Sequence, residues 1–114
     1  MKTDYITCDT TLPPSLAFPR SLLAADVRFT AKEVYVILLD MALNSEPDIH
    51  TDEQGRRYLA FVNKTIAEII DRTPTTVAQS LRELEDAGLV EKKLVARNAP
   101  YHVYVKLHVV EDKP

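Results

Sequence analysis

The spacing of apolar residues along the chain predicts its first helix. Residues 30–45 read TAKEVYVILLDMALNS, and their helically spaced apolar side chains are Val34, Ile37, Leu38 and Met41. Thr30 and Glu33 have the spacing of a capping box, in which a hydroxyl and a carboxylate each accept a hydrogen bond from an otherwise unpaired backbone N–H. The pattern therefore predicts a helix that begins at Thr30.

This first helix is apolar nearly all round, because Tyr35, Val36 and Leu39 add to the main stripe. A central core helix explains the pattern. A second subunit that covers part of the helix explains it as well, and the two explanations are compatible.

Two further helices are predicted after a polar loop. The loop SEPDIHTDEQGRR is followed by a short strand, YLAFV, and then by NKTIAEIIDR, a helix with Ile66, Ile69 and Ile70 on one stripe. A third helix follows almost at once, since Thr73 can cap it, Pro74 suits its first turn and Gly88 can end it. So tight a junction predicts a helix-turn-helix.

The period changes to that of strands after Leu89. LVEKKLVA and YHVYVKLH are strand-like, with RNAP as the turn between them and with Val103, Val105 and Leu107 expected on one face. The order of elements predicts an α+β fold, mostly helical: a winged helix-turn-helix with a three-stranded antiparallel sheet. We expect an extended, proline-containing N-terminal arm at 1–20, the winged-helix domain at 21–110 and a polar tail at 111–114.

The size and charge of the chain narrow its class. With 114 residues it fits one domain with a modest core. The net charge of −3 argues against a nucleic-acid partner, but the distribution is uneven: residues 1–55 carry −5, whereas residues 56–106 carry +3. Such asymmetry between the halves of a chain hints at an anionic partner for the second half.

The third helix has a polar side whose chemistry suits DNA. Thr75, Gln79 and Arg82 fall opposite its apolar stripe, with Thr76 beside them. Hydroxyl, amide and guanidinium groups donate to phosphate oxygens and read base edges in the major groove. The unpaired N–H groups at the start of the helix also attract anions. We therefore expect the Pro74 end to lie nearest the phosphates.

Basic residues flank this helix in sequence. Those expected to hold phosphates are Lys64, Arg72, Lys92, Lys93 and Arg97. Acidic residues, Glu83, Glu85 and Asp86, occupy the other end of the helix, so only its first two turns or so are expected deep in a groove. A polar outer face is common on soluble helices, and it is the flanking bases on the predicted wing that favour DNA.

Catalytic and metal-binding chemistry is not expected. Cys8 is the single cysteine, the histidines at 50, 102 and 108 lack metal-ligand spacing, and two glycines cannot build a phosphate-cradling loop. We therefore expect no enzyme, no metal and no cofactor. No apolar run is long enough to span a membrane and no signal peptide is recognisable, so the cytoplasm is the expected location.

Several segments together resemble the N-terminal domain of RepA-type plasmid replication initiators of Gram-positive bacteria. They are FPRSLL, AKEVYVILLDMA, DEQGRRYLAFVN, TTVAQSLRELEDAGLVEKK and YHVYVKL, and they cover roughly Phe18 to Leu107. The resemblance implies a dimeric winged helix that binds repeated sites at a replication origin, with the third helix in the major groove and the wing alongside. The family usually continues into a second, helical domain.

The resulting expectation is sequence-specific binding of double-stranded DNA as a homodimer, in plasmid or mobile-element replication initiation, with replication proteins as further partners. Transcriptional repression through the same helix is the nearest alternative. A winged helix that binds another protein instead of DNA is a third, favoured by the negative net charge and the apolar first helix.

Overall fold

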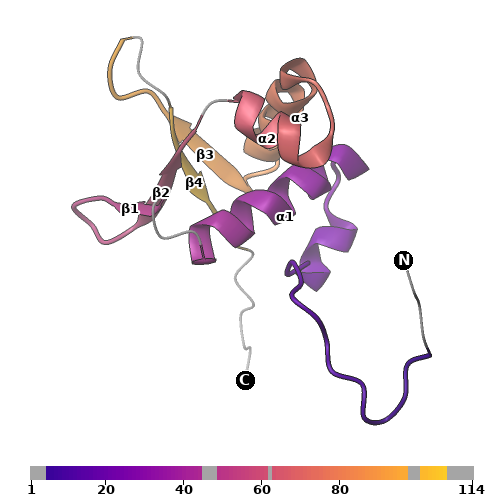
Figure 1. Cartoon of the computed structure of the whole chain (residues 1–114). Coiled ribbons are helices and arrows are strands. Elements are labelled where there is room, and N and C mark those ends of the chain that lie inside the picture. The colour runs from indigo at the N-terminus through magenta and orange to yellow at the C-terminus, as the bar shows by residue number, and fades with distance from the viewer. Residues whose placement is uncertain (1–4, 45–48, 62, 98–100, 108–114) are drawn as a thin grey trace, which may run out of the picture.

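The helices cover one side of an antiparallel sheet in the computed structural model, which describes residues 5–44, 49–61, 63–97 and 101–107 (Figure 1). The elements are η1 (Arg20–Ala24), α1 (Phe29–Asn44), β1 (Ile49–Thr51), β2 (Arg57–Ala60), α2 (Asn63–Ile70), α3 (Pro74–Asp86), β3 (Val90–Lys93) and β4 (His102–Val105). The strand order is β1-β2-β4-β3, and every neighbouring pair is antiparallel. The fold is the predicted winged helix: α2 and α3 form the helix-turn-helix, and β3 and β4 form the wing.

The sheet has four strands rather than the three that the sequence predicted. The extra strand, β1, lies within the segment interpreted as a polar loop, and it pairs His50 with Tyr58 and Ile49 with Leu59 of β2. A strand of three residues leaves too short an alternation to recognise. The strand is defined instead by its pairing with β2 across the turn at Asp52–Gly55.

The first helix begins one residue earlier than predicted, and Thr30 does not cap it. Helix α1 starts at Phe29, and the carbonyl of Arg28 accepts the first helical hydrogen bond from Lys32. The Thr30–Glu33 capping box is therefore wrong. The reason is tertiary: the Glu83 carboxylate of α3 accepts a hydrogen bond from the backbone N–H of Arg28, the residue before the helix, and so takes the part that the acid plays in a capping box.

Helix α1 is the centre of the core, as predicted. Seven of its residues are buried, and α1 packs against α2, α3 and the inner face of the sheet. Because one chain already buries Tyr35, Val36 and Leu39, the apolar character of α1 does not itself require a second subunit. The stripe predicted on α2 is only partly correct: Ile66 is fully buried, but Ile69 is 54% exposed.

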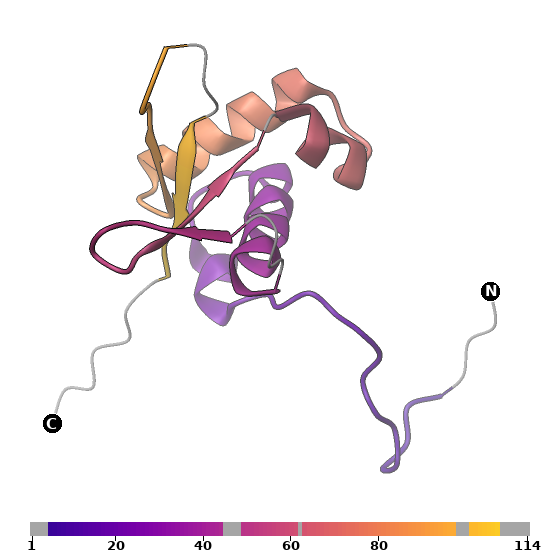
Figure 2. The same ribbon diagram turned by 60° about the vertical axis from the view of Figure 1, so that its left-hand side comes forward.

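The remaining predictions concern the ends of the chain. Residues 5–19 contain no helix or strand and run away from the body of the protein in both Figure 1 and Figure 2. The turn at 98–100, His108 and the tail at 111–114 lie outside the described residues. Among the described residues, no helix has both the length and the apolar character needed to cross a membrane.

Candidate nucleic-acid interface

The junction between α2 and α3 sets the direction of the third helix. Asp71 has a positive φ of 56°, and the Arg72 N–H donates to the Ala67 carbonyl at 2.9 Å, which closes the end of α2 in the manner of a Schellman motif. Only Asp71, Arg72 and Thr73 separate the two helices. This tight turn carries the exposed Arg72 side chain to the start of α3.

The start of α3 is capped as the sequence predicted. The Thr73 hydroxyl accepts from the Thr76 N–H at 3.2 Å, and Pro74 stands in the first turn. The Thr76 hydroxyl also lies 3.0 Å from the Thr73 hydroxyl, so Thr76 serves the cap and is half-buried. The remaining N–H groups of this turn present a positive partial charge to solvent.

The predicted reading face of α3 points outward. Thr75, Gln79 and Arg82 are exposed, and within the described part of the chain they make no hydrogen bond or ion pair with another side chain. The opposite face, Val77, Ser80, Leu81 and Leu84, is buried against α1 and α2. Because the inner face fixes the rotation of the helix, three unpaired polar side chains are held on one outer stripe.

One of the acids of α3 is neutralised by a partner from another element. The Arg28 guanidinium donates to Glu83 at 2.7 and 2.8 Å, and hydrogen bonds from the Arg28 side chain and backbone lower the pKa of Glu83. Glu85 lies beside the wing, where it accepts from the Lys92 N–H at 3.4 Å. Asp86, seven residues after Gln79, falls on the outer stripe about 10 Å further along the helix. The first turns of α3 are thus free of acids.

The two wing lysines point to opposite faces of the sheet. Lys92 pairs with the buried Val103 on the helix-facing side, where its ammonium lies 4.9 Å from the centre of the Tyr101 ring. Lys93 pairs with His102 on the outer side. This follows from strand alternation, and it means that β3 presents only one of the two lysines to any single surface.

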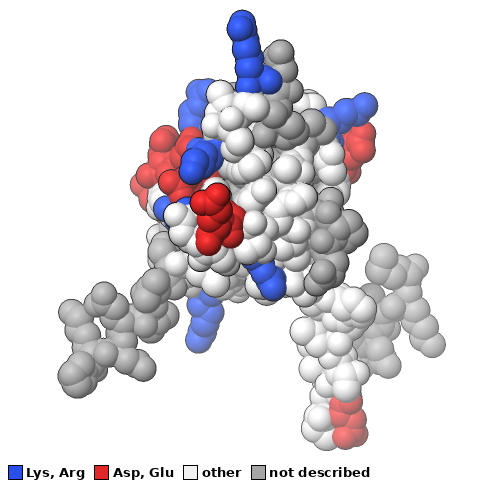
Figure 3. Space-filling model, turned by 90° about the vertical axis from the view of Figure 1, so that its left-hand side faces the viewer, with Lys and Arg blue, Asp and Glu red and all other residues white. Residues whose placement is uncertain are grey.

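The other predicted phosphate contacts are exposed but spread over the molecule. Lys64 lies in the first turn of α2, Arg72 at the helix junction and Arg97 beyond the end of β3. The structure thus brings Arg72 to the start of α3, whereas Lys64 and Arg97 belong to separate elements. Figure 3, which views the side that carries the sheet, shows charged residues of both signs interspersed over a largely uncharged surface.

The outer face of the sheet carries a row of rings that the sequence did not predict. His50, Tyr58 and His102, from three different strands, stack with centroid separations of 5.3 and 4.0 Å. Tyr104 lies 5.6 Å from Tyr58 in a tilted arrangement. Strand alternation within β4 was the one signal available, since it placed His102 and Tyr104 on a common face.

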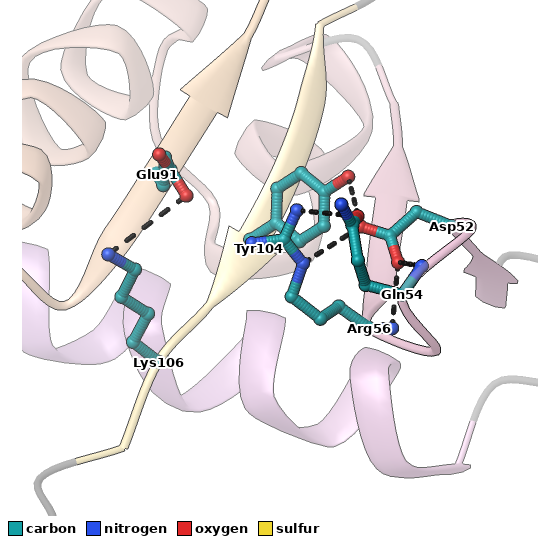
Figure 4. A network of polar contacts seen from close by, with 6 residues as sticks. All are labelled: Asp52, Gln54, Arg56, Glu91, Tyr104 and Lys106. Carbon is teal, nitrogen blue, oxygen red and sulfur yellow. Dashed lines mark hydrogen bonds and ion pairs between the residues drawn. The ribbon is translucent and has the colours of Figure 1, made fainter.

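A polar network closes one end of this row (Figure 4). The Asp52 carboxylate accepts from the Tyr104 hydroxyl at 3.0 Å, from the Arg56 guanidinium at 2.9 Å and from the backbone N–H groups of Gln54 and Arg56. Burial alone would raise the pKa of Asp52, but these hydrogen bonds outweigh it and lower that pKa. Burial, together with the Asp52 bond, raises the pKa of Tyr104.

Three of the rings, Tyr58, His102 and Tyr104, line an open cavity of about 600 Å³ together with the Asp52–Gln54 turn and the wing residues Lys93–Val95. Its lining mixes carboxylate, amide, ammonium and ring groups. Among the described residues, no cluster of three or more His, Cys, Asp or Glu side chains is arranged to hold a metal ion.

Comparison with known proteins identifies relatives for nearly the whole chain. Residues 17–114 match the family described as "Replication initiator protein A (RepA) N-terminus". No curated protein matches the sequence. Solved structures with the same fold include "N-Terminal domain of DNA binding protein", with a TM-score of 0.71 and 20% identity over 97% of this chain and 88% of the other.

Two more solved structures share the fold. "Structure of Rep-DNA complex" has a TM-score of 0.70 and 21% identity, and it covers 96% of this chain and 88% of that chain. "Structure of MDR initiator" has a TM-score of 0.70 and 18% identity, with 86% and 80% of the two chains covered. At these identities the likeness establishes the fold.

Proposed function

The chain belongs to the family of replication initiator protein A N-termini, and from this premise we propose that it binds double-stranded DNA in a sequence-specific manner at repeated sites of a replication origin. The origin is that of a plasmid or mobile element of Gram-positive bacteria, and the protein acts there as a homodimer alongside other replication proteins. It works by binding rather than by catalysis.

The observation that carries this proposal is the outer stripe of α3. Thr75, Gln79 and Arg82 are exposed, unpaired within the described chain and held on a helix whose other face is buried. An α-helix fits the major groove of B-DNA, where an amide pairs with adenine and a guanidinium with guanine. Such a role is in keeping with the likeness of this fold to the protein in "Structure of Rep-DNA complex".

The residues divide by chemistry into two roles. Gln79 and Arg82 read bases, and Thr75 contacts a base or a phosphate near the capped end of α3. Thr76 contributes mainly through the cap, because its N–H and hydroxyl already meet Thr73. The phosphate contacts are assigned to Lys64, Arg72, Lys92 and Arg97, whereas Lys93, the fifth base predicted from the sequence, faces the other side of the sheet.

Selection of binding sites from random duplexes, followed by affinity measurements on the selected site, tests this assignment. Arg82→Ala is expected to weaken binding to the selected site by roughly 5- to 150-fold and to relax preference at one base pair, and Gln79→Ala should relax another. Arg20→Ala is the matched control, because it removes the same charge from η1, far from α3 in sequence. Unchanged affinity and preference in both α3 variants would refute the assignment.

A protein-binding module is the second candidate, and one observation favours it. The outer sheet face has stacked rings and a cavity of about 600 Å³ whose lining has two acids, Asp52 and Glu53, against one base, Lys93, which suits a protein surface better than a phosphate backbone. Salt dependence separates the two functions. DNA binding must weaken steeply as salt rises. The bound protein releases counterions from the DNA, and this release is less favourable when the salt concentration is already high. No binding to duplex at low salt would favour the protein-binding function.

A further inference from the structure

The N-terminal arm, defined as residues 5–19, exposes apolar side chains that the rest of the described chain does not cover. Leu12 is 83% exposed, and Ile6, Leu16 and Phe18 are exposed as well. The hydrogen bonds of Thr7, Asp9 and Ser15 stay within the arm. Four exposed apolar side chains on one short segment, which the rest of the described chain leaves uncovered, favour a segment that binds another surface.

The arm is also stiff, which favours binding. Pro13 and Pro14 fix their own φ angles, and Pro13 holds the preceding Leu12 in an extended conformation. The Ser15 hydroxyl donates to the Pro13 carbonyl at 2.6 Å, which further limits the backbone. A segment that is already extended loses less conformational freedom when it docks.

A groove elsewhere on the molecule has the complementary surface. It lies where the end of α1 meets the end of β4, has a volume of about 250 Å³, and its apolar lining is Leu39, Ala42, Leu43, Val105 and Leu107. Small-molecule pockets usually measure about 300–1,000 Å³. The groove therefore suits one or two inserted side chains better than a free ligand.

The charges of the two surfaces have opposite sign. Asp9 is the one charged residue among positions 5–19, so the arm carries −1. Three bases line the groove: Arg56 and Lys106 are ion-paired with Asp52 and Glu91, and Arg57 carries the remaining positive charge. Arg57 is fixed there by its hydrogen bond to the Ala42 carbonyl at 3.1 Å. Opposite charges favour an encounter of arm and groove and help to set its orientation.

We propose that this groove is a docking site for the N-terminal arm of a second copy of the chain, with Leu12 as the inserted side chain and Leu16 beside it. Two copies that exchange arms reciprocally bury both arms in both grooves and form a closed, symmetric dimer. The inference rests on the homodimer of the proposed function, and it assigns the arm and the groove as the surfaces that form the dimer interface. None of the residues that line the groove belongs to α3.

Disulfide trapping in the full 114-residue chain tests the proposal. In a Cys8→Ser background, which removes the single native thiol, a Leu12→Cys chain and a Leu43→Cys chain of different tag length are mixed and oxidised without DNA. We expect the mixed disulfide to form at least tenfold faster than with Leu23→Cys as the partner. Leu23 is the matched control, because it is an exposed leucine on η1 outside the groove.

Two results would overturn the docking site. One is a mixed disulfide no faster than the Leu23 control. The other is a chain with both Leu12→Cys and Leu43→Cys that closes on itself while the separate chains do not cross-link, which would place the arm in its own groove. Sedimentation adds a second readout, since Leu43→Asp should yield a monomer at concentrations where Leu23→Asp remains a dimer.

The outcome is separable from that of the DNA-binding proposal. Arg82→Ala should leave the cross-linking rate unchanged, because Arg82 lies on the outer stripe of α3. If duplex binding persists in a protein that shows no preferential cross-link, the arm proposal alone fails. If the cross-link forms in a protein that binds no duplex, the DNA proposal alone fails.

Discussion

Arg28, immediately before α1, and Glu83 of α3 are joined by both the side chain and the backbone of the arginine. The guanidinium donates to one carboxylate oxygen at 2.7 and 2.8 Å, and the Arg28 N–H donates to the other at 3.1 Å. The contact therefore lies at the start of α1 and ties it to α3. It also neutralises an acid on α3, the helix that we propose to bind DNA.

This pair should make stability depend on pH in the acid range. Hydrogen bonds from Arg28 lower the folded-state pKa of Glu83 below the usual range of a glutamate. The stabilisation is thus fully present above the unfolded-state pKa and is lost as pH falls through the folded-state pKa. Glu83→Gln should lower the melting temperature at pH 7 and show a smaller further loss between pH 5 and pH 3 than the native chain.

Thermal melts followed by circular dichroism across that pH range provide the measurement. Asp52, whose pKa is also lowered, should leave a residual acid dependence in Glu83→Gln. Glu68→Gln is the control, because it removes an exposed acid of α2 without touching the pair. A Glu83→Gln curve that runs parallel to the native curve would show that the pair contributes nothing to acid sensitivity.

Local signals predicted α3 almost completely. Thr73, Pro74 and Gly88 act on backbone groups within a few residues, so their meaning does not depend on the rest of the fold. The Thr30 cap failed for the opposite reason. The helix instead begins after Arg28, whose N–H is bound by a carboxylate 55 residues away in sequence, and no local pattern indicates such a partner.

The outer sheet face also could not be predicted from local patterns, because its residues come from separate strands. His50, Tyr58 and His102 come from three strands, and they meet only because β1 pairs with β2 and β2 with β4. The stripe of Thr75, Gln79 and Arg82 could be predicted, since a single helix carries it. Strand alternation alone separates Lys92 from Lys93, but the register was needed to tell which of the two faces the helices.

Gly88 is expected to tolerate no side chain without a cost in stability. It has a φ of +77° at the end of α3, where the Leu89 N–H donates to the Leu84 carbonyl at 2.9 Å. A Cβ there would meet no atom within 4 Å, so the cost arises from backbone conformation alone. Gly88→Ala should destabilise the protein by about 1–2 kcal/mol in urea unfolding.

A matched variant, Asp71→Gly, should increase stability. Asp71, with a φ of 56°, occupies the equivalent position at the end of α2, and Asp71→Gly should give a smaller gain, at most about 1 kcal/mol. A destabilised Asp71→Gly protein would mean that the aspartate side chain, and not the backbone strain, decides stability at that turn.

The ring row should stabilise the sheet independently of DNA binding. Tyr58 stacks against His102 at 4.0 Å and against His50 at 5.3 Å, and an aromatic pair contributes about 0.5–1.5 kcal/mol beyond the area it buries. Tyr58→Leu keeps an apolar group in place and should cost about 1 kcal/mol in urea unfolding, with affinity for duplex unchanged. A tenfold loss of duplex affinity in a folded Tyr58→Leu protein would instead place DNA on the outer sheet face.

The opposite orientations of Lys92 and Lys93 predict that only one of them contacts phosphate. Lys92 lies on the sheet face that carries the helices, as α3 does, whereas Lys93 faces the cavity beside His102. Lys92→Ala should therefore reduce the slope of log affinity against log salt by about one, and Lys93→Ala should leave it unchanged. Titration of a duplex at several salt concentrations measures both slopes, with Lys32→Ala of α1 as the control for loss of a charge. A reduced slope for Lys93→Ala and an unchanged slope for Lys92→Ala would contradict this orientation of the wing. That result would place the outer sheet face, with its stacked rings, against the DNA.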